Sequence, residues 1–176
     1  MGERRDAVCM EIIKGRRCMR SFREEAISEQ DLRAILEAGI WAPSGSNAQP
    51  WKFFVVRDRN RIDKIKMVSP GLFGDPPLLV ILSIDRERME GESESEWMVA
   101  IMDAAMAGQN MMLMAYSLGI GSCPMTSFNR KAVKMLLEMP SHIEPVVMIS
   151  FGFPKRWPSP PKRRSLDEVV HYERFG

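Results

Sequence analysis

A basic cluster near the start of the chain places three arginines within five residues: Arg16, Arg17 and Arg20. Arginine presents a planar fork of N–H donors that matches the oxygens of a phosphate group. Cations crowded this closely repel one another unless an anion or solvent screens them. The cluster therefore indicates a phosphate-binding site. The alternative is a solvated helix end, because cations also interact well with a helix C-terminus.

The polar stretch 43–49 offers small donors and acceptors between a predicted helix and a predicted strand. Pro43 must lie at or just past the end of the preceding helix, because it lacks an N–H and clashes with the preceding turn. The next four residues are turn formers: Ser44, Gly45, Ser46 and Asn47. A polar loop between a buried helix and a core strand is a common place for a binding site. An ordinary connecting turn is the alternative.

A second basic cluster, Lys162, Arg163 and Arg164, follows a proline-rich tail over residues 154–161. A tail of this composition is extended and cannot pack inside a helix or a sheet, so we expect it to cross a surface. Alone, the cluster is typical of a solvated basic tail. Combined with the arginines near the N-terminus, it predicts the second half of one anion pocket.

Other chemistries find little support in the sequence. It contains no glycine-rich nucleotide motif, no HExxH zinc motif and no GxSxG nucleophile motif. His142 and His171 are the only histidines, and neither has metal-ligand spacing. We therefore expect neither a metal centre nor a Ser-His hydrolase, and we interpret His142 as structural.

The chain has 176 residues, of which 45% are hydrophobic and 27% charged, and this suits a single domain over residues 1–176. A net charge of +2 gives no field that favours nucleic acid or a membrane. Three cysteines without a CxxC spacing argue against a secreted disulfide framework. The N-terminus lacks an apolar signal region, and Asp103, Gln109 and Asn110 interrupt the longest apolar stretch. We expect a soluble cytoplasmic protein.

Helices and strands alternate along the predicted chain. Apolar periodicity predicts helices from the Ser28 cap to Pro43 and over residues 6–15, 59–68, 96–118 and 130–138. Apolar runs predict strands over residues 52–57, 78–84 and within 144–153. The charged segment 85–95 is predicted to be a mobile, solvated loop. A buried helix in the middle of such a series indicates a layered α+β or α/β domain.

Two of these motifs together resemble the N-terminal signature of the nitroreductase family of flavoproteins. They read Arg-Arg-x-x-Arg-x-Phe, then a helix, then Ala-Pro-Ser-Gly-x-Asn-x-Gln-Pro-Trp. The resemblance extends over nearly the whole chain. It implies an α+β sandwich in which helices flank a central, mostly antiparallel sheet and extended termini wrap a homodimer partner. It also implies FMN bound at the subunit interface, with NADH or NADPH as co-substrate.

The resemblance, carried over residue by residue, predicts which side chains bind the cofactor. The residues at the FMN phosphate, ribityl chain or ring edge are Arg16, Arg17, Cys18 and Arg20. The residues that complete the phosphate site come from among Lys162, Arg163 and Arg164. The residues on the loop that approaches the flavin, in many members from the other subunit, are Pro43, Ser44, Gly45 and Asn47. Gln49 is predicted to support that loop.

The segment 119–128 resembles the place where a backbone N–H of the family reaches flavin N5. Ser127 occupies that position, preceded by the lining residues Pro124, Met125 and Thr126. A serine supplies the same amide only if its backbone angles suit a residue with a Cβ, and a plain strand-entry turn is the alternative. Cys18 falls where many members have a serine, and because a thiol is a weak donor we favour a structural cysteine over a redox role.

The resemblance implies an FMN-dependent oxidoreductase with a ping-pong cycle. Hydride passes from NADH or NADPH through flavin N5 to a small electron-poor acceptor, such as a nitroaromatic or a quinone. The flavin carries this chemistry, so no side chain is predicted as an obligatory acid or base. One alternative keeps the fold for dehalogenation, azoline oxidation or flavin destruction. Another is a non-enzymatic flavin carrier or an interaction module for nucleic acid, against which the near-neutral charge argues.

Overall fold

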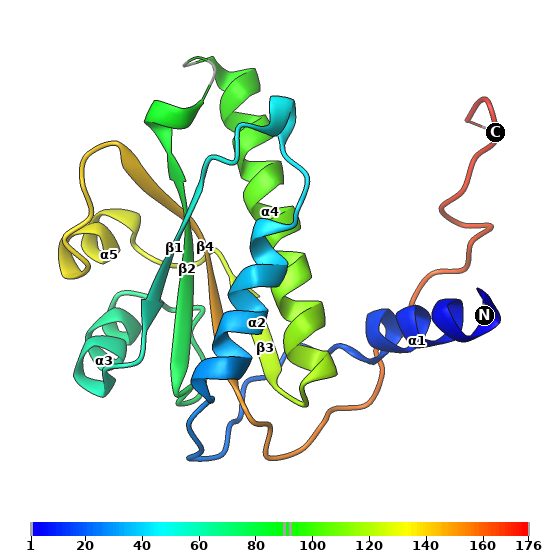
Figure 1. Cartoon of the computed structure of the whole chain (residues 1–176), viewed down its shortest axis with the longest axis horizontal. Helices are drawn as coiled ribbons and strands as arrows, with labels where there is room; N and C mark the ends of the chain where they lie inside the picture. The colour runs from blue at the N-terminus through cyan, green and yellow to red at the C-terminus, as the bar shows by residue number, and fades with distance from the viewer. Residues whose placement is uncertain (1, 90, 92, 176) are drawn as a thin grey trace.

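The computed structural model describes residues 2–89, 91 and 93–175, arranged as Figure 1 shows. The helices are α1 (Gly2–Gly15), α2 (Glu29–Ile40), α3 (Arg59–Met67), α4 (Glu94–Ser117) and α5 (Arg130–Leu136). The strands are β1 (Trp51–Val56), β2 (Leu78–Asp85), β3 (Gly121–Met125) and β4 (Ile143–Gly152). Two short 3-10 helices are η1 (Gly45–Asn47) and η2 (Arg86–Arg88).

The strands form one antiparallel sheet in the order β1-β2-β4-β3. The central strand β2 is buried along its whole length, and its successive side chains face opposite sides. Leu82 packs with Ile35 of α2 and Met111 of α4, whereas Ile81 packs with Ile65 of α3. Burial on both faces explains why this strand is apolar throughout, as the sequence predicted.

The helices cover both faces of the sheet. Figure 1 shows α2 and α4 on one face and α3 and α5 on the other. Each pair buries its apolar side chains in its own core cluster against the sheet. This arrangement confirms the predicted α+β sandwich, with an antiparallel sheet between two layers of helices.

The longest helix, α4, is the central helix that the sequence predicted, but it begins two residues earlier, at Glu94. The reason is a capping box: Ser93 Oγ accepts from the Glu96 N–H at 3.3 Å, and Glu96 Oε2 accepts from the Ser93 N–H at 3.0 Å. By length and hydropathy α4 could span a membrane, but 44% of its most apolar window is buried inside the protein. The core helix of a globular protein has these same properties.

The two ends of the chain leave the body of the domain on the same side, as Figure 1 shows. Helix α1 begins at Gly2, four residues before the prediction. Residues 157–161 of the proline-rich tail have neither helix nor strand, as predicted, and Trp157 meets the ring of Tyr116 edge-on at 5.2 Å. The tail therefore crosses the last turn of α4.

Strand β3 corrects the sequence interpretation, which placed only a turn after the central helix. The run is short and contains Pro124, which has no N–H, so its strand propensity is weak. An edge position in the sheet tolerates the missing donor. Gly119, with a φ of 75°, ends the preceding helix as predicted.

The remaining boundaries lie close to the predictions. The ends of α3, α5, β1, β2 and β4 fall within two residues of the predicted ranges. The charged segment 85–95 contains the last residue of β2, then η2 and the start of α4. Its residues 90 and 92 lie outside the described residues, so the predicted mobility of this segment stays a prediction.

Candidate functional site

The N-terminal basic cluster lies where α1 ends. Nη1 of Arg17 donates to the carbonyl oxygens of Lys14, Gly15 and Arg16, the last two at 2.9 Å. These carbonyls have no partner within the helix, so the guanidinium caps the C-terminus of α1. The helix-end interpretation that the sequence left open therefore holds for this arginine. Its buried Nε has no hydrogen-bond partner among the described residues.

A groove of about 720 Å³ brings the two basic clusters together. Arg16 and Arg17 line it from the end of α1, and Arg163 lines it from the tail. Tyr116 of α4 and Pro161 also line it, as do Lys14 and the acidic Glu11 of α1. Cations from opposite ends of the sequence thus face one cavity, as the proposed anion pocket requires.

Not every predicted cation lies in this groove. Lys162 and Arg164 are exposed and do not line it. Arg20 is also exposed, and its guanidinium carbon lies 5.6 Å from the ring centre of Phe73. It lines a separate polar pocket of about 410 Å³ together with Lys155. Of the six predicted cations, three therefore line the groove, two are exposed outside it, and Arg20 lines a different pocket.

Two cysteines lie next to the basic cluster. Cys18 is exposed and forms an isolated parallel bridge to Ser122, one residue before the buried Cys123. Burial, and after it the neighbouring Cys18, raise the pKa of the Cys123 thiol to about 11, although Arg20 and Arg16 act to lower it. A thiol with so high a pKa holds little reactive thiolate at neutral pH, which agrees with a structural role for Cys123.

The end of β3 and the residue after it border a small apolar pocket of about 320 Å³. Pro124, Met125 and Thr126 line it, opposite the small residues Ala105 and Gly108 of α4. An apolar pocket with small residues on one side can accept a flat ring.

Ser127 follows this pocket and is exposed. Its φ is not among the positive values in the described chain, so a residue with a Cβ fits its backbone without strain. Its carbonyl accepts from the Gly71 N–H at 3.1 Å, whereas its own N–H donates to no acceptor in the described residues. The backbone angle φ of Ser127 therefore suits a residue with a Cβ, as the sequence analysis required for a serine at this position.

The polar loop 43–49 has an unusual backbone. Ser46, Asn47 and Gln49 all have positive φ values, 46°, 55° and 49°, which are uncommon for residues other than glycine. Ser44 holds the turn, because its Oγ accepts from the Gln49 N–H at 3.0 Å. Gln49 in turn donates from Nε2 to the carbonyl of Asn47 at 3.3 Å, which agrees with its predicted supporting role.

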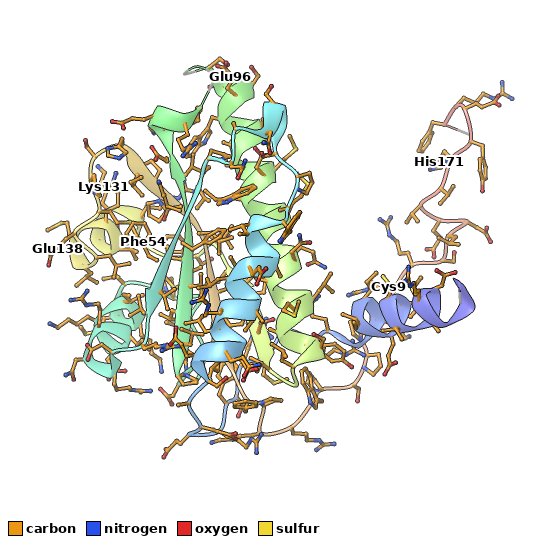
Figure 2. All side chains as sticks on the ribbon, viewed as in Figure 1. Cys9, Phe54, Glu96, Lys131, Glu138 and His171 are labelled. Atoms are coloured by element: carbon orange, nitrogen blue, oxygen red, sulfur yellow. The ribbon has the colours of Figure 1, made fainter. Side chains whose placement is uncertain are left out.

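The loop lies against the first half of α4, where Gly45 donates its N–H to Asp103. The groove lies at the other end of this helix, beside Tyr116. At ~1.5 Å per residue, these two positions are about 20 Å apart along the helix axis. Figure 2 shows Glu96 at one end of α4 and Cys9 on α1, which lies near the other end of α4. One chain therefore does not bring the two predicted halves of the site together.

Asp103 contacts the polar loop, and the sequence analysis did not identify it. It is only 4% exposed although it carries a carboxylate. Burial raises its pKa, and the hydrogen bond from Gly45 acts against that increase. The available signal was a single acidic residue in the middle of an otherwise apolar helix, but it served only as an argument against a membrane span.

One further cluster combines Asp85, Glu87 and His142, whose ligand atoms lie within 4.8 Å of one another. The Lys52 ammonium already lies 3.4 Å from the Asp85 carboxylate and offsets its charge. Nδ1 of His142 lies 3.6 Å from the Glu87 carboxylate. These two contacts account for the proximity of the three side chains at the end of the sheet.

Comparison with known proteins identifies relatives of this chain. The sequence model of the nitroreductase family matches residues 13–70 and 61–153. A Thermus thermophilus protein named NADH dehydrogenase is 30% identical, over 88% of this chain and 91% of its own. A Thermotoga neapolitana protein named iodotyrosine deiodinase is 26% identical, over 94% of this chain and 97% of its own.

The fold itself is shared with solved structures. The crystal structure of a nitroreductase family protein from Streptococcus pneumoniae superposes with a TM-score of 0.84, covering 94% of this chain and all of that one. Sequence identity between the two is 22%, so this likeness concerns the fold alone. The family match and the 30% identical relative carry the assignment, and the chain belongs to the nitroreductase family, as its two N-terminal motifs predicted.

Proposed function

We propose that this protein is an FMN-dependent oxidoreductase. The observation that carries the proposal is the groove in which Arg16, Arg17 and Arg163 meet, because it gathers cations from both ends of the chain at one place. When bound there, FMN supplies the redox chemistry: hydride passes from NADH or NADPH to its ring and on to an electron-poor acceptor, such as a nitroaromatic or a quinone. Membership of the family and the names of its relatives support an oxidoreductase.

The groove suits the phosphate end of the cofactor. Arg16 and Arg163 make no ion pair with an acidic side chain in the described part of the chain, so both can meet an anion. The buried Nε of Arg17 is a further donor without a partner. An N–H buried without an acceptor is unfavourable, and a phosphate oxygen would satisfy it. The absence of a dinucleotide fingerprint in the sequence favours FMN over FAD.

The pocket beside β3 suits the flavin ring. Its apolar wall of Pro124, Met125 and Ala105 can pack against a flat aromatic system. The Ser127 N–H, which has no acceptor among the described residues, is the proposed donor to N5. The chain thus offers binding and orientation, and no side chain is proposed to transfer a proton.

We also propose that a second copy of the chain completes the site. The polar loop 43–49 lies about 20 Å along α4 from the groove, and in the proposed arrangement the loop that meets the flavin comes from the partner. Helix α4 presents exposed apolar side chains that a partner can cover: Met98, Val99, Met102 and Met106. We further propose that FMN binds at the subunit interface, that residues 1–176 form a single domain and that the protein is cytoplasmic.

Dehalogenation is the alternative reaction that a specific observation favours. The relative from Thermotoga neapolitana, matched over 94% of this chain, bears the name iodotyrosine deiodinase. A panel of acceptors that includes halogenated phenols separates this reaction from the reduction of nitroaromatics and quinones.

The groove makes the role of each tail cation testable. Replacing Arg163 by alanine is expected to weaken FMN binding at least about tenfold, since a hydrogen bond to a charged group contributes on the order of 1.5–3 kcal/mol. Arg164, which does not line the groove, is the matched control, and its alanine variant is expected to bind within about twofold of the native protein. Titration of apoprotein with FMN measures both, and the loss is expected to shrink as salt screens the charges. Equal affinities for the two variants would remove the tail from the phosphate site.

Cys18 offers a second test, because it adjoins the cluster that is proposed to hold FMN. Bound FMN is expected to slow alkylation of Cys18 by iodoacetamide, measured by mass spectrometry of its peptide. Cys9, exposed on α1, is the internal reference whose labelling FMN leaves unchanged. Cys123 is expected to react slowly at pH 8 and faster only as pH approaches its raised pKa of about 11. Labelling of Cys18 that is insensitive to FMN would contradict the proposed position of the cofactor.

The requirement for a second copy predicts an obligate homodimer. Interfaces of this kind commonly bury more than ~2,000 Å² in total, and the exposed apolar face of α4 contributes to it. Analytical ultracentrifugation at micromolar concentration is expected to show one species of twice the 20.1 kDa chain mass. A stable monomer that still holds FMN would refute the shared site.

A further inference from the structure

Among the described residues, a buried carboxylate in the apolar helix α4 has a single hydrogen-bond donor. Both oxygens of Asp103 lie 3.3 Å from the backbone nitrogen of Gly45. No ion pair to Asp103 is found in the described residues. Acidic side chains are almost never fully buried unless they are paired. The position of Asp103 is therefore unfavourable in itself, and its one partner is the loop that precedes β1.

The loop needs an anchor, because its backbone is strained. Three of its residues, Ser46, Asn47 and Gln49, have positive φ values. Such conformations persist only where the surrounding structure enforces them. The remaining hydrogen bonds found between residues 44 and 49 all stay inside the loop. Within the described chain, the contact from Gly45 to Asp103 is thus the loop's hydrogen-bonded link to the body of the domain.

Packing holds the same point of the loop against α4. A Cβ placed on Gly45 would lie 2.8 Å from Cγ1 of Val99, which is closer than real Cβ contacts. Val99 and Asp103 are four residues apart, so they share one face of the helix. The missing side chain at Gly45 lets its N–H approach the carboxylate, and a larger residue would force the loop away from it.

We propose that Asp103 is a positioning residue that fixes the loop 44–49 on α4 through the Gly45 N–H. The anchoring follows from the geometry above. Its consequence for cofactor and acceptor rests on the proposed function, in which this loop meets the flavin of the partner subunit. Asp103 then affects a site that it does not touch, by setting where Ser44 and Asn47 are held.

Hydrogen–deuterium exchange of the FMN-loaded full-length protein tests the anchoring directly. Asp103→Leu removes the acceptor, and exchange in the peptide that covers residues 44–50 is expected to rise at least about tenfold, while exchange in α4 stays unchanged. Asp103→Asn keeps an oxygen that accepts from Gly45, so its loop is expected to exchange within about threefold of the native rate. Asp63→Asn, which removes a carboxylate exposed on α3, is the control for charge.

A global readout separates positioning from a merely structural role. Because burial raises the pKa of Asp103, its carboxyl ionises at a higher pH in the folded chain than in the unfolded one. Its ionised form therefore opposes folding at neutral pH, and Asp103→Asn is expected to leave the unfolding midpoint equal or higher. If the carboxylate were merely structural, its replacement would instead lower the unfolding midpoint and speed exchange along the whole of α4. That result would overturn the proposal.

Gly45→Ala perturbs the same contact from the other side and keeps the test decisive if Asp103→Leu does not fold. The alanine meets Val99, so exchange of the loop is expected to rise as in Asp103→Leu. The double variant Gly45→Ala with Val99→Ala removes the clash and is expected to restore slow exchange. If slow exchange persists in Gly45→Ala alone, Asp103 does not anchor the loop.

The functional consequence is measured separately, by FMN titration and by the KM of the electron acceptor. With Asp103→Leu, the KM is expected to rise several-fold with a smaller change in kcat, because a displaced loop weakens binding rather than hydride transfer. Faster loop exchange with unchanged KM and FMN affinity would support the anchoring role of Asp103 but contradict its link to the proposed function. Unchanged exchange would contradict the anchor whatever the protein binds.

Discussion

The packing of α4 across one face of the sheet is the constraint on which the rest of the structure depends. The helix approaches the strands closely, and a Cβ added at Gly108 would lie 3.2 Å from Ile149 of β4 and 3.3 Å from Leu82 of β2. Because this contact fixes α4, it also fixes what each end of the helix holds. Asp103 receives the polar loop in the first half of the helix, and Tyr116 meets the tail in its last turn.

The length of α4 divides the predicted site into two parts. The basic groove and the apolar pocket beside β3 lie toward its C-terminal half, while the strained loop lies on its N-terminal half. A rigid helix cannot bring the loop to the groove of the same chain. The division is explained if two chains each lend a loop to the other, and the exposed methionines of α4 then lie between them. Helix α4 would thus keep the loop and the groove of one chain apart, and at the interface it would bring the loop of one chain to the groove of the other.

Much of the fold could be predicted from local patterns, because these patterns also determine the local structure. The caps at Ser28 and Asn129, the apolar run of β2 and the glycine after α4 all act within a few residues. Strand β3 could not be predicted in this way, since pairing with β4 decides its structure against a weak propensity.

The site was predictable in its residue types but not in its geometry. The motifs identified the arginines, yet only the fold shows that Arg17 caps α1 while Arg163 reaches the groove and Arg164 does not. The contact between Asp103 and Gly45 joins residues 58 apart in the sequence, and no local pattern reveals such a contact.

The central claim, that the chain works as a flavin oxidoreductase, is tested most directly by anaerobic reduction. The account predicts that NADH or NADPH bleaches the visible absorbance of the FMN-loaded protein and that a nitroaromatic or a quinone restores it. A protein that takes up no FMN, or whose bound flavin neither nicotinamide reduces, would contradict it.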